Sequence, residues 1–228
     1  MPEGKIVAFE GIDGSGKGTQ AQALADRAAA HGLSVACFAF PRYSGSFYGE
    51  LCVRYLRGEF GAIGDQSPYL SALPYAGDRL EAAPLIEAAR RSHELVVIDR
   101  YVGSNAAHQG AKLSLDAFSH FAEWIARLEY EVHGIPAEDA VVMLDIPVET
   151  AAGLMAARRR DSGRVDDIHE RDLEYLAEVR IRYQWMAANW AGWWSIACDE
   201  MDALRPPEGI AADIAAHLSG VLALPLAD

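Results

Sequence analysis

The sequence predicts an α/β protein with a five-stranded parallel sheet and helices on both faces. Apolar runs of strand length alternate with segments of helical periodicity, an order that favours a parallel sheet with right-handed crossovers. Most of these runs are continuously apolar, as in strands that are buried on both faces. A Gly-rich turn stands between the first run and the first helical segment. The expected strands cover residues 5–10, 34–40, 95–99, 140–145 and 193–198.

Proline residues and helical periodicity set the expected helices. Ser67-Pro68 provides an N-cap and a first helical residue. Pro74 should interrupt the helix that follows, and Pro84 can start a new one. The longest amphipathic pattern covers residues 114–133 and begins at a serine cap. Further helices are expected at 20–31, 50–57, 150–160, 169–189 and 208–222.

Composition and charge limit the possible classes of protein. The 228 residues contain no linker long enough to mark a domain boundary, so we expect a single domain over 1–228. A net charge of −13 argues against a general nucleic-acid binder. Cys37, Cys52 and Cys198 form no C-x-x-C pair, which fits the reducing cytoplasm. No apolar run approaches the length of a membrane span, and we expect neither a span nor a signal peptide.

The stretch at residues 11–19 predicts a phosphate-binding loop, or P-loop. It matches G-x-x-x-x-G-K between a strand and a helix, where several backbone N–H groups and the helix dipole face one anion. Lys17 would reach the outer phosphates of a nucleotide, although a chance Gly-rich turn is the alternative. Gly18 stands where Ser or Thr usually supplies a magnesium ligand. The predicted nucleotide-binding residues are Gly11, Gly14, Ser15, Gly16, Lys17, Gly18 and Thr19.

Charged residues near the predicted carboxyl edge of the sheet suit phosphoryl transfer, which depends on positioning and charge neutralisation. Asp99 ends a buried strand, where an acid can hold Mg²⁺ directly or through water, or can cap a helix. Arg79 and Arg100 belong to the same edge, with a surface ion pair as the alternative for Arg79. A lid is expected at about residues 155–170, and its arginines could instead form a solvated helix end. They include Arg158, Arg159 and Arg160.

Several other residues allow two interpretations. Asp13 lies inside the P-loop and would face a hydroxyl or Mg²⁺, or would only stabilise the loop as an Asx-type turn. His108 could contact a ligand or lie in the core. Arg42 could contact a ligand or form a surface ion pair. Phe40 and Tyr43 could stack against a base or pack the loop around them.

Four motifs together resemble the thymidylate kinase family, in its order and at about its spacing, from residue 5 to about 198. The P-loop alone is shared by many unrelated NTPases, and the combination of motifs is far more specific. The motifs are Phe9-Glu10-Gly11-Ile12-Asp13-Gly14-Ser15-Gly16-Lys17, Phe40-Pro41-Arg42-Tyr43, Ala76-Gly77-Asp78-Arg79 and Asp99-Arg100-Tyr101-x-x-Ser104-Asn105. Shorter matches are Ala107-His108-Gln109-Gly110, Leu144-Asp145-Ile146-Pro147 and Asp167-Ile168-His169-Glu170.

The resemblance implies a cytoplasmic homodimer that transfers the γ-phosphate of ATP to dTMP, with Mg²⁺, and so produces dTDP for dTTP biosynthesis. It implies that Lys17 holds ATP, that Asp13 faces the nucleotide sugar and the metal–phosphate site, and that Asp99 serves the metal. Arg79 and Arg100 would grip the phosphate of dTMP. The expected acceptor contacts are Asp13, Phe40, Arg42, Tyr43, Arg79, Arg100, Ser104, Asn105, His108 and Gln109.

The family's lid closes arginines over the phosphates and excludes water. Some members carry a catalytic arginine inside the P-loop, but here those positions are Gly14 and Ser15. The resemblance therefore implies that the lid supplies it. The expected catalytic residues are Asp13, Lys17, Arg100, Arg158, Arg159 and Arg160.

Two other functions are compatible with parts of the pattern. One is a kinase for another nucleoside monophosphate or for a deoxynucleoside, although two arginines, Arg79 and Arg100, suit an acceptor that already carries a phosphate. The other is a P-loop module that binds a nucleotide without catalysis. A module that only binds one nucleotide has no need for a second nucleotide pocket, which the motifs that begin at Phe40 and Asp99 imply.

Overall fold

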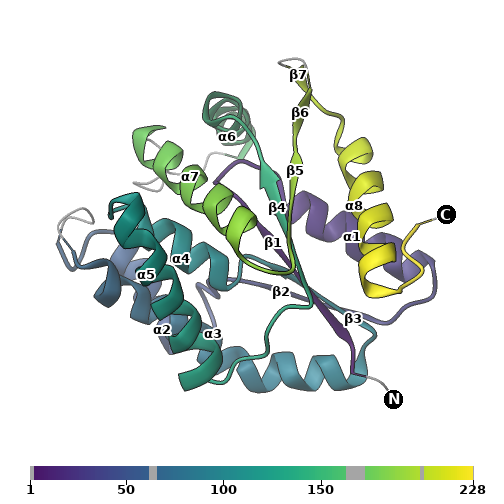
Figure 1. Cartoon of the computed structure of the whole chain (residues 1–228), viewed down its shortest axis with the longest axis horizontal. Helices are drawn as coiled ribbons and strands as arrows, with labels where there is room; N and C mark the ends of the chain where they lie inside the picture. The colour runs from purple at the N-terminus through teal and green to yellow at the C-terminus, as the bar shows by residue number, and fades with distance from the viewer. Residues whose placement is uncertain (1–2, 62–65, 163–172, 201–202, 228) are drawn as a thin grey trace.

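The sheet has the predicted architecture. In the computed structural model, which describes residues 3–61, 66–162, 173–200 and 203–227, five parallel strands lie in the order β2-β3-β1-β4-β5 (Figure 1). The central strand β1 pairs with β3 and β4, so the strand that leads into the P-loop has a neighbour on each side. The strands are β1 (Lys5–Glu10), β2 (Val35–Ala39), β3 (Leu95–Asp99), β4 (Ala140–Asp145) and β5 (Trp193–Ala197).

Helices cover both faces of the sheet, as predicted (Figure 1). One face carries α1 (Lys17–Ala30) and α8 (Pro207–Leu222), which pack on each other. The other face carries α3 (Pro68–Ser92), α4 (Val102–Gly110), α5 (Leu115–Ala126) and α7 (Leu173–Asn189). Two more helices complete this side: α2 (Phe47–Leu56) packs on α3, and α6 (Val148–Ser162) packs on α7. The apolar side chains of β1, β3 and β4 form the centre of the core.

The second strand is less buried than the sequence indicates. The run at 34–40 was expected to be buried on both faces, but β2 lies at the sheet edge and is partly exposed along its length. Its thiol at Cys37 is exposed. The expectation was wrong because a continuous apolar run does not distinguish a central strand from a short edge strand covered by helices.

The prolines do not divide α3. Pro74 and Pro84 both lie inside one helix of 25 residues, so the expected interruption and the new start at Pro84 are wrong. Each proline removes an amide donor and crowds the preceding turn. Packing of α3 against α2, α4 and β3 stabilises the continuous helix despite the two prolines. As a result Asp78 and Arg79 stand near the middle of a long, supported helix.

The helix expected over residues 114–133 changes its geometry part-way. Ser114 caps α5 as predicted, with its hydroxyl accepting from the Ala117 amide at 3.4 Å. Residues Arg127–Val132 then form a π-helical segment, η2. A π-turn holds more residues per turn, which rotates the apolar stripe. Val132 is therefore 68% exposed, whereas Glu129 is fully buried.

A short antiparallel pair, β6 (Asp199–Glu200) and β7 (Ala203–Leu204), was not expected from the sequence. Pairs of two-residue strands have no periodicity that a sequence pattern can detect. Across the described ranges, every helix is too short or too polar to span a bilayer.

Candidate active site

The P-loop joins β1 to α1 at the carboxyl edge of the sheet. Its glycines at 11, 14 and 16 all have positive φ, at 141°, 82° and 90°. A Cβ at Gly11 would lie 2.7 Å from the Leu144 carbonyl oxygen, so the loop passes too close to β4 for a side chain. Helix α1 begins at Lys17, directly after the loop. The predicted cradle therefore has the backbone shape and the helix N-terminus that bind phosphate.

Lys17 is buried and folded back onto the loop. Its ammonium donates to the Ile12 carbonyl at 2.7 Å and lies 3.4 Å from the Ser15 hydroxyl. Burial, together with the positive charge of Arg100, lowers the pKa of Lys17 to about 8, against opposing effects of nearby carboxylates. An arriving phosphate would favour the charged form.

Asp13 and Arg100 form an ion pair between the P-loop and the end of β3. Arg100 has a left-handed backbone with φ of 64°, and its amide donates to the Phe9 carbonyl at 3.0 Å. Its guanidinium also reaches the Ser104 hydroxyl at 3.5 Å and His108 Nε2 at 3.3 Å. The predicted catalytic pair thus bridges the P-loop and the pocket described next.

Asp99 lies beside the first turn of α1. Its Oδ1 is buried and has no hydrogen-bond partner among the described residues. A Cβ at Gly18 would stand 3.0 Å from Asp99 Oδ2. The missing side chain at position 18 therefore leaves room for a carboxylate next to the P-loop lysine. A free carboxylate oxygen is a suitable ligand for Mg²⁺.

A pocket opens beside this edge, and nine of the ten predicted acceptor contacts line it. They come from four segments: the P-loop, the end of β2, α3 and the β3–α4 region. The nine are Asp13, Phe40, Tyr43, Arg79, Arg100, Ser104, Asn105, His108 and Gln109. The pocket is completed by Pro41, Leu56 and Tyr75. The Phe40 ring packs 6.0 Å from Tyr101, and its peptide bond with Pro41 is cis.

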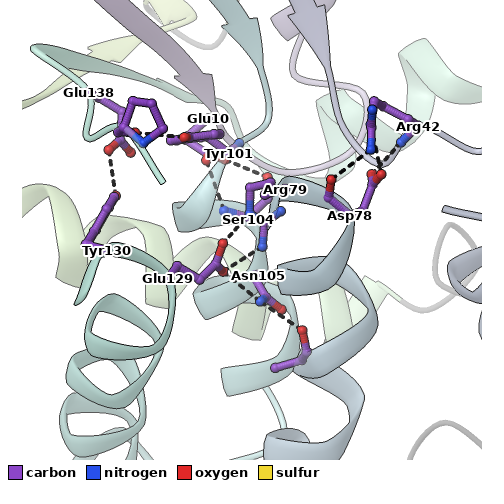
Figure 2. Close-up of polar contacts among 12 residues, drawn as sticks. Glu10, Arg42, Asp78, Arg79, Tyr101, Ser104, Asn105, Glu129, Tyr130 and Glu138 are labelled. Carbon is purple, nitrogen blue, oxygen red and sulfur yellow. Dashed lines mark hydrogen bonds and ion pairs between the residues drawn. The ribbon is translucent and has the colours of Figure 1, made fainter. Parts of the chain in front are cut away.

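Arg42 is the predicted contact that does not line the pocket among the described residues. Its amide and its Nε donate to the two carboxylate oxygens of Asp78, at 2.7 and 2.9 Å (Figure 2). The Ser46 hydroxyl, which caps α2, donates to the same carboxylate at 2.5 Å. Asp78 is fully buried and so fixes the loop that follows Phe40. Arg42 is therefore paired as its alternative expected, but with a buried carboxylate and not at the surface.

Arg79 is held by a buried carboxylate from η2. Its Nε and Nη2 donate to the two oxygens of Glu129, and Asn105 Nδ2 donates to the same Glu129 at 3.0 Å (Figure 2). The exposed side-chain fractions of Arg79 and Glu129 are 3% and 0%. The pairing cancels most of the charge of Arg79 locally.

A second buried carboxylate, Glu10 at the end of β1, organises the start of α4 (Figure 2). It accepts from the backbone amides of Tyr101 and Ser104 at 2.8 and 3.0 Å, and from the Ser104 hydroxyl at 2.6 Å. The Tyr183 hydroxyl adds a bond of 3.0 Å. A carboxylate at a helix N-terminus is favoured by the helix dipole. Glu10 thereby fixes the chain that directly follows Arg100.

The expected lid lies only partly within the described residues. Helix α6 passes over the P-loop, since a Cβ at Gly14 would lie 2.6 Å from the Ala151 carbonyl oxygen. Arg158 is exposed on the same helix. The side chains of Arg159 and Arg160, and the rest of the lid up to residue 170, are outside the described part. The assignment of a catalytic arginine therefore stays a prediction.

Sequence reasoning missed Glu10, Glu129, Leu56 and Tyr75. Glu129 interrupts the apolar stripe of a helix, four positions after the buried Ile125, and a charge at such a position is a signal of a buried partner. Glu10 directly follows four buried strand residues and carries the same signal. Leu56 and Tyr75 show no signal, because apolar and aromatic residues on helices are ordinarily core residues.

The fold and the site define a P-loop protein of the nucleotide kinase type, with a second pocket beside the phosphate cradle. A family model described as thymidylate kinase matches residues 9–210. The chain is 36% identical over 211 residues to the thymidylate kinase of Mycobacterium tuberculosis H37Rv, covering 89% of this chain and 98% of that one. It is 33% identical over 222 residues to that of Leifsonia xyli, covering 95% of each. The chain belongs to the thymidylate kinase family.

A solved structure of thymidylate kinase from Candida albicans has a similar fold. It superposes with a TM-score of 0.72 at 19% sequence identity, over 96% of this chain and 92% of that one. This similarity supports the fold of the chain, including the arrangement of the parallel sheet with its helices.

Proposed function

We propose that the protein transfers the γ-phosphate of ATP to dTMP and produces dTDP and ADP. The observation that carries the proposal is the Asp13–Arg100 pair, which lines the acceptor pocket and lies against the P-loop. At this place Arg100 can neutralise the phosphate of the acceptor while the P-loop holds the phosphates of the donor close to it. Membership of the thymidylate kinase family supports dTMP as the acceptor.

Each half of the site has its own task in this proposal. The P-loop and Lys17 bind the phosphates of ATP, and Arg100 contacts the phosphate of dTMP. Asp13 lies between them and faces the sugar and the metal–phosphate site. The lid arginines Arg158, Arg159 and Arg160 would close over the phosphates and exclude water.

Arg79 is better suited to the base than to the phosphate. The sequence expectation put both Arg79 and Arg100 on the phosphate. Arg79, however, is held through two bonds by the fully buried Glu129, whereas Arg100 has a single bond to the partly exposed Asp13, which a phosphate can replace. Arg79 lies next to Asn105 through their shared carboxylate partner, so we assign it to the edge of the base. Phe40 and Tyr43 then form the aromatic wall.

Mg²⁺ fits the donor side of the site. Asp99, with its unpartnered buried oxygen and the space left by Gly18, would hold the ion directly or through water. When bound, the ion would neutralise charge on the transferred phosphoryl group. A cytoplasmic homodimer remains part of the proposal, and the exposed leucines of α3 offer apolar surface for a second subunit. They are Leu70, Leu73, Leu80 and Leu85.

A panel of acceptors tests the proposal. ADP release from ATP and Mg²⁺ would be measured with dTMP, dUMP, UMP, dCMP and thymidine. We expect the highest kcat/KM with dTMP and no turnover of thymidine, because a neutral nucleoside has no group for Arg100. Phosphorylation of thymidine without phosphorylation of dTMP would refute the proposal. ATP hydrolysis that is independent of every acceptor would favour a nucleotide-binding module instead.

A further inference from the structure

The amide of Asn105 has only one chemically acceptable orientation. Its Nδ2 donates to the Ala72 carbonyl at 3.1 Å and to Glu129 Oε1 at 3.0 Å (Figure 2). A carbonyl and a carboxylate can only accept, so a reversed amide would set oxygen against oxygen twice. The Oδ1 atom is buried and has no hydrogen-bond partner among the described residues. Asn105 lines the acceptor pocket, and the acceptor it has left is this oxygen.

The same carboxylate fixes the neighbouring guanidinium. Glu129 binds Arg79 through Nε and Nη2, which leaves Nη1 as the nitrogen that Glu129 does not engage. Arg79 can only donate. The acceptor pocket therefore combines an acceptor from Asn105 with a donor from Arg79. Glu129 holds Arg79, and Glu129 and the Ala72 carbonyl together orient Asn105.

This pattern distinguishes two classes of pyrimidine. A 4-oxo pyrimidine presents an N3–H donor beside the O4 acceptor, which complements Asn105 Oδ1 and Arg79. A 4-amino pyrimidine presents an N3 acceptor beside an amino donor, so both contacts become mismatched. Mismatched buried polar groups are costly, and sites built on hydrogen bonds discriminate strongly for this reason.

We propose that Glu129 is the positioning residue that sets the preference of this site for 4-oxo over 4-amino pyrimidine nucleotides, an inference that rests on the proposed function. Glu129 reaches the two residues from η2, where it is fully buried four positions after the buried Ile125. It touches neither substrate nor reacting atoms in this role. It acts by holding the Arg79 donor in place and, together with the Ala72 carbonyl, by keeping Asn105 Oδ1 toward the base.

Glu129→Gln replaces one carboxylate oxygen by an amino group with almost no change of side-chain shape, so it tests the hydrogen bonds that Glu129 accepts. Glu129 Oε1 accepts from both Arg79 Nη2 and Asn105 Nδ2, so the new side-chain amide keeps its carbonyl at that position and sets its amino group against Arg79 Nε. Because Arg79 can only donate, it loses this contact and is no longer held in one orientation. The donor that opposes a 4-amino group is then no longer fixed, so the mismatch for a 4-amino base is reduced.

The measurement is kcat/KM for dTMP, dUMP and dCMP in the full-length protein. In Glu129→Gln we expect the dTMP/dCMP ratio to fall by at least about 10-fold, from the loss of enforced hydrogen-bond complementarity. The dTMP/dUMP ratio should stay within about twofold, because both bases carry the 4-oxo group and differ only in a methyl group. A merely structural defect would lower all three values together.

A matched control is Glu138→Gln. Glu138 is another buried carboxyl, bonded to the Tyr130 hydroxyl at 2.6 Å, and it does not line the acceptor pocket (Figure 2). We expect its ratios to equal those of the wild type. If Glu129→Gln does not fold, Glu129→Asp keeps the charge but withdraws the carboxylate from Asn105. A smaller fall of the dTMP/dCMP ratio, about threefold or more, is then expected.

The outcomes separate the inference from the proposed function. An unchanged dTMP/dCMP ratio in a folded Glu129 variant would overturn the inference, and so would a wild-type protein that uses dCMP as well as dTMP. Both results would leave the assignment as a dTMP kinase intact. A wild-type protein inactive on dTMP would instead overturn the proposed function.

Discussion

The two halves of the site are built in different ways. The proposed donor half is one continuous stretch, residues 11–19, in which the backbone shape would bind the phosphates. The acceptor half is assembled from side chains of distant segments, which three buried carboxylates, Glu10, Asp78 and Glu129, hold in place. A backbone cradle recognises any phosphate, whereas a fixed set of side chains recognises one particular group. Selectivity for the acceptor is therefore expected to depend on the residues that orient its pocket.

Removal of the P-loop lysine should have the largest effect. In Lys17→Met we expect kcat/KM for both substrates to fall by at least about 100-fold, since the transferred phosphate loses its positive partner. The fold should persist, as checked by circular dichroism. The control is Lys5→Met, which removes an exposed lysine paired with Asp139. Full activity in Lys17→Met would remove the basis for calling residues 11–19 the donor half.

The pH dependence should separate the two halves. The pKa of Lys17 is lowered to about 8, so the free protein loses the ammonium as the pH rises through this value. We expect kcat/KM for ATP to fall by about 10-fold between pH 8 and pH 9.2, whereas kcat at saturating ATP stays nearly level because bound phosphate raises the pKa. Steady-state kinetics across pH 6.5–9.5 would check this. A flat profile for ATP would contradict the assigned role of Lys17.

Loosening the acceptor loop should affect one substrate only. Asp78→Asn removes the charge that binds Arg42 and weakens the loop after Phe40. We expect the KM for dTMP to rise about fivefold with the KM for ATP unchanged, a modest case of substrate misplacement. Glu59→Gln, which breaks the exposed pair with Arg54, is the matched control and should change neither value. Equal increases for both substrates would argue against two independently built halves.

A methyl group at position 18 should have the smallest effect. Because its Cβ would meet Asp99 Oδ2 at 3.0 Å, Gly18→Ala displaces the carboxylate proposed to serve Mg²⁺. We expect the Mg²⁺ concentration for half-maximal activity to rise about threefold, while the melting temperature does not fall. Gly153→Ala in α6, where a Cβ meets nothing, controls for the helix propensity. An unchanged Mg²⁺ requirement would contradict the assignment of Asp99 as the residue that holds the metal.

The sequence predicted the sheet, the P-loop and most of the pocket, because periodicity and short motifs report on local structure. Nine of ten predicted acceptor contacts line one pocket, since the carboxyl ends of parallel strands meet at one edge. The exceptions come from tertiary packing. Arg42 is bound by Asp78, which lies 36 positions away, and Glu129 is buried with Arg79 and Asn105 from two other helices as its partners. Pro84 likewise stays inside a helix that its neighbours support.

The ion pair of Asp13 and Arg100 has a consequence for how an acceptor enters. Arg100 already has an anion of its own, supplied by the chain and tethered beside it. In the proposed function, entry of the acceptor nucleotide is therefore an exchange of one anion for another at Arg100. A tethered carboxylate has a high effective concentration, so dilute chloride or sulfate competes poorly with it. A ligand that brings a phosphate together with further contacts can displace the carboxylate. Simple salt anions lack those further contacts, so Arg100 stays available for the nucleotide in ordinary salt.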